Sequence, residues 1–393
     1  MTNLTTANRT IWETGVLAVA DGMLVADKFA KTKVIGMRAG GTYVVNRLLR
    51  VAPVTSAGTF GTVVAGTSAK NLVSNKIEVT PELWQDHFGF DDDVDIKAFF
   101  TDADYQKTIG QQMANSLDKE LIKTISTQCL RHRIDADGTY QKAFTAASGS
   151  TTTIVATGLL TEADDFWNGA YATITNASGP GYDTTNQVTD FTTADDTLTF
   201  GTAFPNAPSS ASEVRITAGE GIAATDVLTS DGLIAVAALH RKLETEKFPG
   251  GVLHGFMDAA QEADLWKDTD FINNANYDAS QRYANYRLVR WLDMELLITS
   301  NIYRTDDEDV ASATGVIYVA PIFGANSYCL IKWGTPGAGN YGVKFHYVLE
   351  PDSGNLTLNE RYVSWKTSIG KKVLRSTSVI GLMTGATDLV LNV

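Results

Sequence analysis

The chain has 393 residues, of which 44% are hydrophobic and 20% charged, so its length and composition are typical of a globular protein of about two to three domains. Asp and Glu number 45 against 32 Lys and Arg, which gives a formal net charge of -13 at pH 7. A chain with this excess of negative charge is poorly suited to binding a polyanion over its main surface. We therefore exclude a protein that recognises nucleic-acid sequence directly.

The first forty residues show no long regular pattern. Apolar residues recur over residues 11–29, but Gly15 and Gly22 interrupt them, which predicts short helical pieces on a largely extended arm. An arm of this kind often crosses to a neighbouring subunit.

Residues 42–50 and 71–80 alternate between apolar and polar side chains, which predicts two strands that pair with each other. Residues 53–70 between them are almost all Gly, Ala, Ser, Thr and Val, so they lack the large side chains needed for a core. We expect a long hairpin or flexible loop that projects from the body. Because its unpaired edges invite association, another subunit is expected to cover it.

A long amphipathic helix is predicted within the stretch 103–133, because apolar residues recur there at every fourth position. They are Ile109, Met113, Leu117, Leu121, Ile125 and Cys129. A helix of about 27 residues would be roughly 40 Å long, enough for the rest of the chain to pack along it. Asp102 or Asp104 is expected to cap its start, and Arg131, His132 and Arg133 are expected at the carbonyl end of its dipole.

Residues 145–218 are rich in Thr, Ala, Gly and Asp, and they predict a small all-β insertion. Short alternating runs occur at 152–156, 171–175, 187–191, 197–200 and 213–217, separated by turn signals such as the Gly-Pro-Gly at 179–181. This spacing is in the range of a sandwich or barrel module. Surface decoration is the expected role, and binding of a receptor or partner is the alternative.

The rest of the chain mixes helices and strands. Helices are predicted at 229–246 and 258–270 and strands at 252–257, 294–303, 316–319 and 329–333, which together indicate an α/β region. Residues 341–349 and 356–375 predict a strand pair with its turn at 351–354, expected to lie along the long helix.

Motifs that carry chemistry are weak. GAGNYG at 337–342 fits G-x-G-x-x-G, but an alternating strand pattern follows where a dinucleotide site needs a helix. The acidic run Asp91, Asp92, Asp93 and Asp95 lacks the glycine bend of a calcium loop, so solvated turn and helix-start charge is preferred over a cation site. Residues 135–138, Asp-Ala-Asp-Gly, place their glycine two positions too early for a calcium loop and predict a turn.

Cysteine and histidine spacing also predicts no site. Cys129 and Cys329 lie far apart in buried patterns, which indicates neither a disulfide framework nor a zinc site and favours folding in a reducing cytosol. No ligand spacing links His87, His132, His240, His254 and His346, and His240, at an apolar margin, is expected to be structural. Residues 1–8 lack a targeting pattern, and no apolar stretch is long enough to span a membrane. We therefore predict no catalytic, cofactor-binding or metal-binding residues.

The order of these parts resembles the major capsid proteins of tailed bacteriophages, with the Hong Kong 97 type of fold. Within residues 253–303, and in one later segment, the similarity is sharper, to the podophage coat family related to that of coliphage N-four. The segments that carry it are DLWKDTDF, SQRYANYRLVRWLDMELLITSNIY and GVIYVAPIFGANSY.

This resemblance implies an α+β fold with a defined series of parts. They are an N-terminal arm at 1–40, an extended β-loop at 41–80, a peripheral domain with the spine helix at 81–144, an all-β insertion domain at 145–218, an α/β axial domain at 219–340, and peripheral strands with the C-terminus at 341–393.

The resemblance further implies a non-enzymatic coat protein whose copies form hexamers and pentamers of an icosahedral shell around double-stranded DNA, which the shell contacts non-specifically. Scaffold, portal and cement or decoration proteins are the further partners implied. The protein would belong to the virion and assemble in the host bacterial cytoplasm. We interpret the acidic charge as keeping the inner surface from trapping the genome.

Some members of the wider fold crosslink subunits through Lys and Asn side chains, and Lys70 and Asn71 lie near the end of the β-loop, although no pattern singles them out. Three other classes stay open: a tail tube subunit, an encapsulin-like compartment shell, and an enzyme of an unusual kind. The long helix with a separate α/β region argues against the tail tube.

Overall fold

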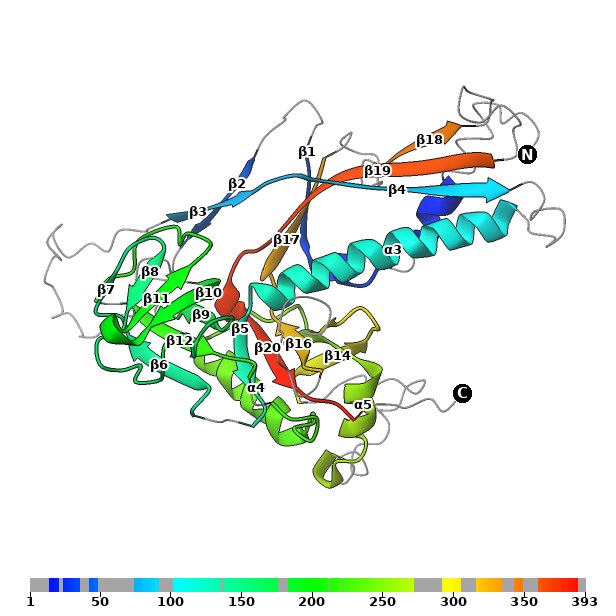
Figure 1. The fold of residues 1–393 in the computed structure, drawn as a ribbon. Helices are drawn as coiled ribbons and strands as arrows, with labels where there is room; N and C mark the ends of the chain where they lie inside the picture. Colours follow the sequence, from blue (N-terminus) through cyan, green and yellow to red (C-terminus); the bar gives the residue numbers. More distant parts are fainter. Residues whose placement is uncertain are drawn as a thin grey trace, which may run out of the picture. The chain divides into compact units, whose positions relative to one another are not determined.

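A computed structural model of the chain divides into two units, each built from separate stretches of sequence (Figure 1). Unit 1 comprises Met1–Val44, Glu78–Leu121 and Tyr328–Lys372, and unit 2 comprises Val45–Ile77, Ile122–Ser327 and Val373–Val393. Within these stretches, the structure describes residues 14–20, 24–35, 42–48, 74–91, 102–135, 138–175, 183–210, 212–220, 222–271, 292–304, 316–333, 343–348 and 360–387.

Unit 1 contains a five-stranded sheet organised around its longest strand. Its strands are β1 (Lys31–Ile35), β4 (Glu82–Asp91), β17 (Tyr328–Trp333), β18 (Lys344–Val348) and β19 (Glu360–Val373). Strand β19 pairs antiparallel with both β4 and β18, and β1 pairs parallel with β17. The late strand pair predicted from the alternating sequence is therefore confirmed as β18 and β19.

Helix α3 (Asp102–Thr127) packs against one face of this sheet. All six residues of its predicted apolar seam are buried. Ile109, Met113 and Leu117 share a core with Leu330 of β17 and with Val363, Trp365 and Ile369 of β19. The prediction that the strand pair lies along the long helix is thus confirmed.

The helix ends earlier than the sequence predicts. Residues Leu130–Arg133 form strand β5, so Arg131, His132 and Arg133 do not lie at the carbonyl end of the helix, and that expectation was wrong. Strand β5 pairs parallel with β20 (Val379–Thr384). Burial in this sheet stabilises residues 130–133 more than an interaction of their charges with the helix dipole would. Asp102 and Asp104 both lie inside the helix, and the capping position before them is outside the described residues.

The N-terminal segment is packed within unit 1 over residues 14–35. The short helical pieces predicted there are confirmed, whereas the largely extended course expected of an arm is not. Residues 14–20 are helical, and η1 (Ala26–Phe29) and β1 follow. Val16, Leu17, Ala20 and Leu24 are buried in the core shared with α3. Their burial supplies the free energy that an isolated arm would lack. Residues 1–13 lie outside the described part.

The N-terminal helix approaches α3 closely at Gly110. A Cβ at this position would lie 2.8 Å from the Val16 carbonyl oxygen and 2.9 Å from the Val19 Cβ. Helix propensity alone would make Gly110→Ala stabilising by about 1 kcal/mol. A destabilising effect of this substitution therefore shows that the added methyl group clashes with the N-terminal helix. We expect Gly110→Ala to lower the free energy of unfolding by about 1–3 kcal/mol, measured by chemical denaturation.

Gly138 offers the control for this substitution, because nothing lies within 4 Å of a Cβ built there. Gly138→Ala should leave the free energy of unfolding within about 0.5 kcal/mol of the wild-type value. If Gly110→Ala stabilised the chain, the close helix packing described above would be contradicted.

Strands β2 (Tyr43–Leu48) and β3 (Ser74–Val79) pair with each other in a two-stranded sheet, as the alternation of residues 42–50 and 71–80 predicts. The chain between them, including the Gly- and Ala-rich residues 53–70, lies outside the described residues. The projecting loop therefore stays a prediction.

A seven-stranded sheet in unit 2 follows the order β6-β12-β9-β10-β11-β8-β7. Its strands are β6 (Gln141–Thr145), β7 (Ser148–Gly149), β8 (Thr153–Val155), β9 (Tyr171–Ile174), β10 (Thr184–Thr192), β11 (Thr197–Phe200) and β12 (Glu213–Thr217). The five strands predicted here are confirmed, whereas β6 and β7 were missed. Trp167, Ile174 and Phe191 lie at the centre of a core that belongs to this sheet.

A six-stranded sheet in unit 2 follows the order β14-β13-β16-β20-β5, with β15 paired to β16. Here β13 is Leu253–Met257, β14 Met294–Ile298, β15 Tyr303–Arg304 and β16 Tyr318–Phe323. Helix α4 (Ser230–Lys242) begins after the cap Thr229, and α5 (Ala259–Leu265) begins with a capping box of Asp258 and Gln261. These elements confirm the predicted mixture of helices and strands.

Two strands lie in sheets other than those expected. Strand β17, predicted in the α/β region at 219–340, joins β1 and β19 in the five-stranded sheet. Strand β20, near the C-terminus, joins β16 and β5 in the six-stranded sheet. All six residues of β20 are buried, so a central position in that sheet removes its apolar side chains from water.

Candidate functional site

The two cysteines do not supply a nucleophile. Burial raises the pKa of Cys129 to about 11 and that of Cys329 also to about 11. Because the thiolate is the reactive form, both side chains are essentially thiols at neutral pH. The Cys129 Sγ donates to the Ser126 carbonyl oxygen at 3.0 Å, as a packed structural residue does.

The histidines fall on separate elements. His87 is exposed on β4, His132 lies on β5, His240 on α4 and His254 on β13, while the side chain of His346 is outside the described set. In the part of the chain that the structure describes, no group of three His, Cys, Asp or Glu side chains could hold a metal ion. Nor does any helix among those residues have the length and apolarity needed to cross a membrane.

His240 is a structural residue, as its position on an apolar margin predicts. It is 1% exposed, its Nε2 donates to the Ile322 carbonyl oxygen at 3.1 Å, and its Nδ1 lies 3.0 Å from the Thr245 Oγ1. Burial lowers its pKa from 6.5 to about 4. The imidazole is therefore neutral in the folded chain at neutral pH.

The depressed pKa of His240 makes stability depend on pH. Below pH 6.5 His240 binds a proton in the unfolded chain but stays neutral in the folded chain, which favours unfolding. The folded state therefore has its full stability above pH 6.5 and loses stability as the pH falls toward 4. We expect about 3 kcal/mol less stability from this group at pH 4 than at pH 7. Denaturant titrations at both pH values should show a smaller difference in His240→Gln, and an equal difference in both proteins would contradict the assignment.

Of the motifs weighed in the sequence, only part of the Asp-Ala-Asp-Gly segment at 135–138 has side chains within the described chain. The Asp135 carboxylate accepts two hydrogen bonds from the guanidinium of Arg133, at 2.9 and 2.5 Å, which makes it an ion-pair partner. The GAGNYG motif at 337–342, the loop residues Lys70 and Asn71, and the side chains of the acidic run lie outside the described set.

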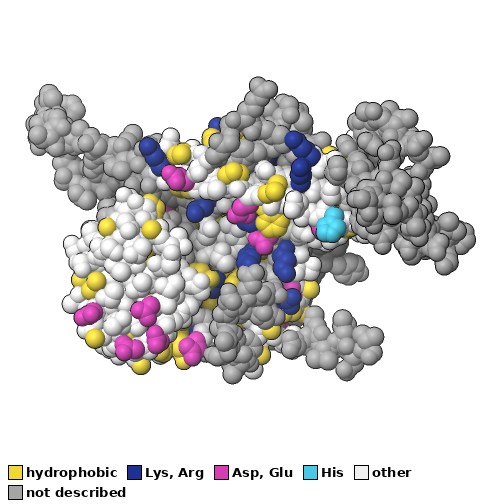
Figure 2. Space-filling model, turned by 45° about the horizontal axis from the view of Figure 1, so that its top comes forward, with side chains coloured by type: hydrophobic (Ala, Val, Ile, Leu, Met, Phe, Trp, Pro, Cys, Tyr) yellow, Lys and Arg dark blue, Asp and Glu magenta, His cyan; other side chains and the backbone are white. Residues whose placement is uncertain are grey.

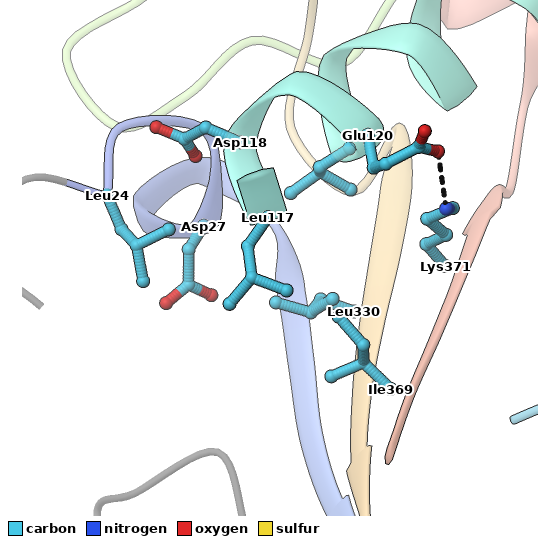
Figure 3. Close-up of a pocket in the computed structure, with 9 residues that line it drawn as sticks. Leu24, Asp27, Leu117, Asp118, Glu120, Leu330, Ile369 and Lys371 are labelled. Carbon is cyan, nitrogen blue, oxygen red and sulfur yellow. Dashed lines mark hydrogen bonds and ion pairs between the residues drawn. The ribbon is translucent and has the colours of Figure 1, made fainter. Parts of the chain in front are cut away.

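A small pocket in unit 1 lies between the N-terminal segment, α3 and the sheet (Figure 3). Its cavity volume is about 10 Å³, room for roughly one water molecule and too little for a substrate. Leu24, Leu117, Leu330 and Ile369 form its apolar wall, and the charged groups at its margin are Asp27, Asp118, Glu120 and Lys371.

The charged groups around this pocket are engaged with other protein groups. The Asp118 carboxylate accepts the backbone N–H groups of Val25 at 2.8 Å and Ala26 at 3.1 Å. Lys371 pairs with Glu120 at 2.9 Å, and Lys332 pairs with Asp27 at 3.2 Å. The arrangement fixes the N-terminal segment to α3 and leaves no free acid or base aimed into the cavity.

Tyr328 completes this attachment. Its hydroxyl donates to the Ala26 carbonyl oxygen at 2.6 Å, and burial together with the nearby Asp118 and Asp27 charges raises its pKa well above 10. Burial is also the main reason that the pKa of Asp118 is raised. We call Asp118, Tyr328, Val25 and Ala26 the N-segment anchor.

Arg131 and Arg133 join the two sheets of unit 2, which sequence reasoning missed. Arg133 is fully buried and donates to the carbonyl oxygens of Ala218 at 2.8 Å and Glu220 at 2.5 Å. The Arg131 guanidinium lies 3.5 Å from the ring centre of Tyr171 on β9. The only signal was their position after the predicted helix, which pointed to a different role.

Open strand edges and exposed apolar residues are the features that suggest association. Strand β1 forms one edge of the five-stranded sheet, with four of its five residues exposed. Leu83 on β4 is 63% exposed and Val44 on β2 is 39% exposed. Exposed edges of this kind attract another chain unless they are covered.

The fold is similar to that of phage capsid proteins. The capsid of Ralstonia phage GP4 matches with a TM-score of 0.55 and 15% sequence identity, over 93% of this chain and 89% of that chain. The capsid of cyanophage Pam1 matches with a TM-score of 0.50 and 14% identity, over 89% of this chain and 86% of that chain. No protein-family model and no curated protein matches the sequence. The chain therefore has a mixed helix-and-sheet fold of the phage capsid kind.

Proposed function

We propose that this chain is a major capsid protein, many copies of which assemble into the icosahedral shell that encloses the double-stranded DNA of a tailed phage. The observation that carries the proposal is the match to phage capsid folds over about nine tenths of the chain. Among the described residues no group of three His, Cys, Asp or Glu side chains could hold a metal ion. The charged groups at the margin of the unit 1 pocket hold the N-terminal segment and the sheet to α3.

The proposed layout is that of the Hong Kong 97 type. Helix α3 and the five-stranded sheet would form the peripheral domain, β2 and β3 the base of the extended β-loop, and the six-stranded sheet the axial domain. The seven-stranded sheet would be the insertion domain. The boundaries we propose follow the sheets, so β17 belongs to the peripheral domain and β20 to the axial domain.

Assembly would derive its stability from many modest contacts. In a closed lattice each copy meets several others, so weak contacts add through effective concentration and the shell outlasts any single interface. We propose hexamers and pentamers of this chain, with scaffold, portal and cement proteins as further partners and non-specific contact with DNA. The protein would then be a virion component that assembles in the host cytoplasm.

Sedimentation of the purified chain tests this function. Particles that sediment far faster than the 42.4 kDa chain, and that appear in negative stain as closed shells, are the expected result. Tubes would support a tail tube subunit, and shells that copurify with one protein cargo would support an encapsulin-like compartment. A stable 42.4 kDa species under all assembly conditions would contradict the proposal.

Covalent crosslinking through Lys70 and Asn71 stays a separate prediction, and we expect it to be absent. Denaturing electrophoresis of intact particles should show a single band at 42.4 kDa. A ladder above that mass would show that subunits are linked.

A further inference from the structure

One face of the five-stranded sheet points away from α3 over strands β4, β18 and β19. Residues directly opposite on neighbouring strands share a face, and successive residues alternate between faces. Trp365 belongs to the core with α3, and it lies opposite Phe345 and Asp86. Lys366, the next residue, therefore points to the other face together with its partners Lys344 and Gln85.

Among the described residues, no element packs on this outward face, and the face is basic. Lys344 and Lys366 are both exposed and lie directly opposite each other, and neither has an ion-pair partner among the residues that the structure describes. Like charges in opposite positions destabilise a strand pair, so the arrangement favours an anionic partner. Leu83, 63% exposed, and His87 lie on the same face. We call Leu83, Gln85, His87, Lys344 and Lys366 the lysine face.

The seven-stranded sheet carries the opposite charge at one corner. Asp164, Asp165, Asp190 and Asp195 are exposed, and none of them forms an ion pair within the described chain. They lie together, because the Asp165 N–H donates to the Phe191 carbonyl oxygen at 3.0 Å and the Asp164 carboxylate accepts the Thr193 N–H at 2.7 Å. We call these four residues the acidic corner. Figure 2 shows carboxylate side chains in magenta on the otherwise largely uncharged surface of the part of unit 2 that contains the seven-stranded sheet, at the left of the picture.

We propose that, in the assembled shell, the lysine face of one copy docks on the acidic corner of a second copy. This inference rests on the proposed capsid function. Each copy carries a formal charge of -13, so like-charged copies repel unless opposite charges meet where they touch. The chain itself supplies the matching carboxylates, whereas its negative charge disfavours a nucleic acid as the occupant of the lysine face.

A charge-swap experiment tests this docking in the full-length chain. Wild-type shells are first confirmed by sedimentation, so that failure of the proposed function shows itself before any variant is made. The test variant is Lys344→Glu with Lys366→Glu, and the control is Lys107→Glu with Lys242→Glu, which changes the net charge equally at exposed positions on α3 and α4. Circular dichroism of each unassembled chain checks the fold.

We expect the minimum protein concentration for shell assembly to be at least about tenfold higher for the test variant than for the wild type. The reason is that the lost attraction between the lysine face and the acidic corner is repeated at every such contact in the shell. The control should assemble as the wild type does. Adding Asp164→Lys and Asp165→Lys to the test variant should restore assembly. The proposal is overturned if the test variant assembles like the control, if the added lysines do not restore shells, or if the test variant forms normal shells and loses only DNA retention.

Discussion

Replacing Arg133 with Ala is expected to lower the free energy of unfolding by about 3–5 kcal/mol, because it removes one partner of a buried charged network. The guanidinium is fully buried and donates to the Asp135 carboxylate and to the carbonyl oxygens of Ala218 and Glu220. Without it these acceptors lose their donors inside the protein. Chemical denaturation followed by tryptophan fluorescence measures the loss.

Two further variants separate this network from a simple loss of charge. Arg133→Lys keeps the charge but not the planar fork that binds several acceptors, so an intermediate loss is expected. Arg241→Ala removes an arginine whose side chain is 63% exposed and whose ion pair with Asp293 spans 3.5 Å, so it should cost less than about 1 kcal/mol. A similar small cost for Arg133→Ala would show that the buried network does not stabilise the chain.

Replacing Asp118 with Ala is the second large effect, with an expected loss of about 2–4 kcal/mol. Its carboxylate is 3% exposed and accepts the backbone N–H groups of Val25 and Ala26, which would be left without acceptors. The loss should be accompanied by faster proteolysis within residues 14–35, because the N-segment anchor no longer holds them. Limited proteolysis with mass spectrometry locates the cleavage.

Asp118→Asn is the matched variant, since it keeps the shape and one side-chain acceptor. Burial raises the pKa of Asp118 above 3.8, so the folded chain holds this proton more tightly than the unfolded chain. The resulting stabilisation is complete below pH 3.8 and is lost as the pH rises through the raised pKa. Asp118→Asn has no carboxyl group to titrate, so its free energy of unfolding relative to the wild type should rise as the pH rises from 3.8 through the raised pKa of Asp118. A fall over this pH range would contradict the raised pKa.

Local periodicity explains why much of the fold could be predicted. The apolar seam of α3 recurs every fourth residue, and Ile109, Met113 and Leu117 are buried where that pattern places them. The alternation of β18 and β19 and the five runs of the seven-stranded sheet were likewise readable, because each strand buries one set of alternate side chains.

Pairing between distant segments explains most of what the sequence did not reveal. Strand β5 follows α3 directly but pairs with β20 near the C-terminus, so the helix ends before the basic residues that were expected to cap it. Arg133 finds its acceptors at Ala218 and Glu220, and Asp118 finds its donors in the N-terminal segment. No periodicity within a short window encodes such contacts, since they depend on the assembled sheets.

The N-terminal segment shows how a composition-based expectation can differ from the structure. Gly15 and Gly22 interrupt the apolar pattern and indicated short helical pieces on a largely extended arm. The short helix at residues 14–20 is confirmed, but its apolar residues pack in a core with α3. Gly110 of α3 allows this close approach because it lacks a side chain. Gly110 therefore allows two helices to pack closely. A sequence pattern alone does not distinguish a glycine with this role from one that ends a helix.

Electron cryomicroscopy of the assembled protein tests the central claim most directly. We expect a closed icosahedral shell in which this chain forms rings of five and six copies and β2 and β3 extend onto a neighbouring copy. A reconstruction that shows an open tube, or a preparation that contains only separate single chains with β2 and β3 covered by their own chain, would contradict the account.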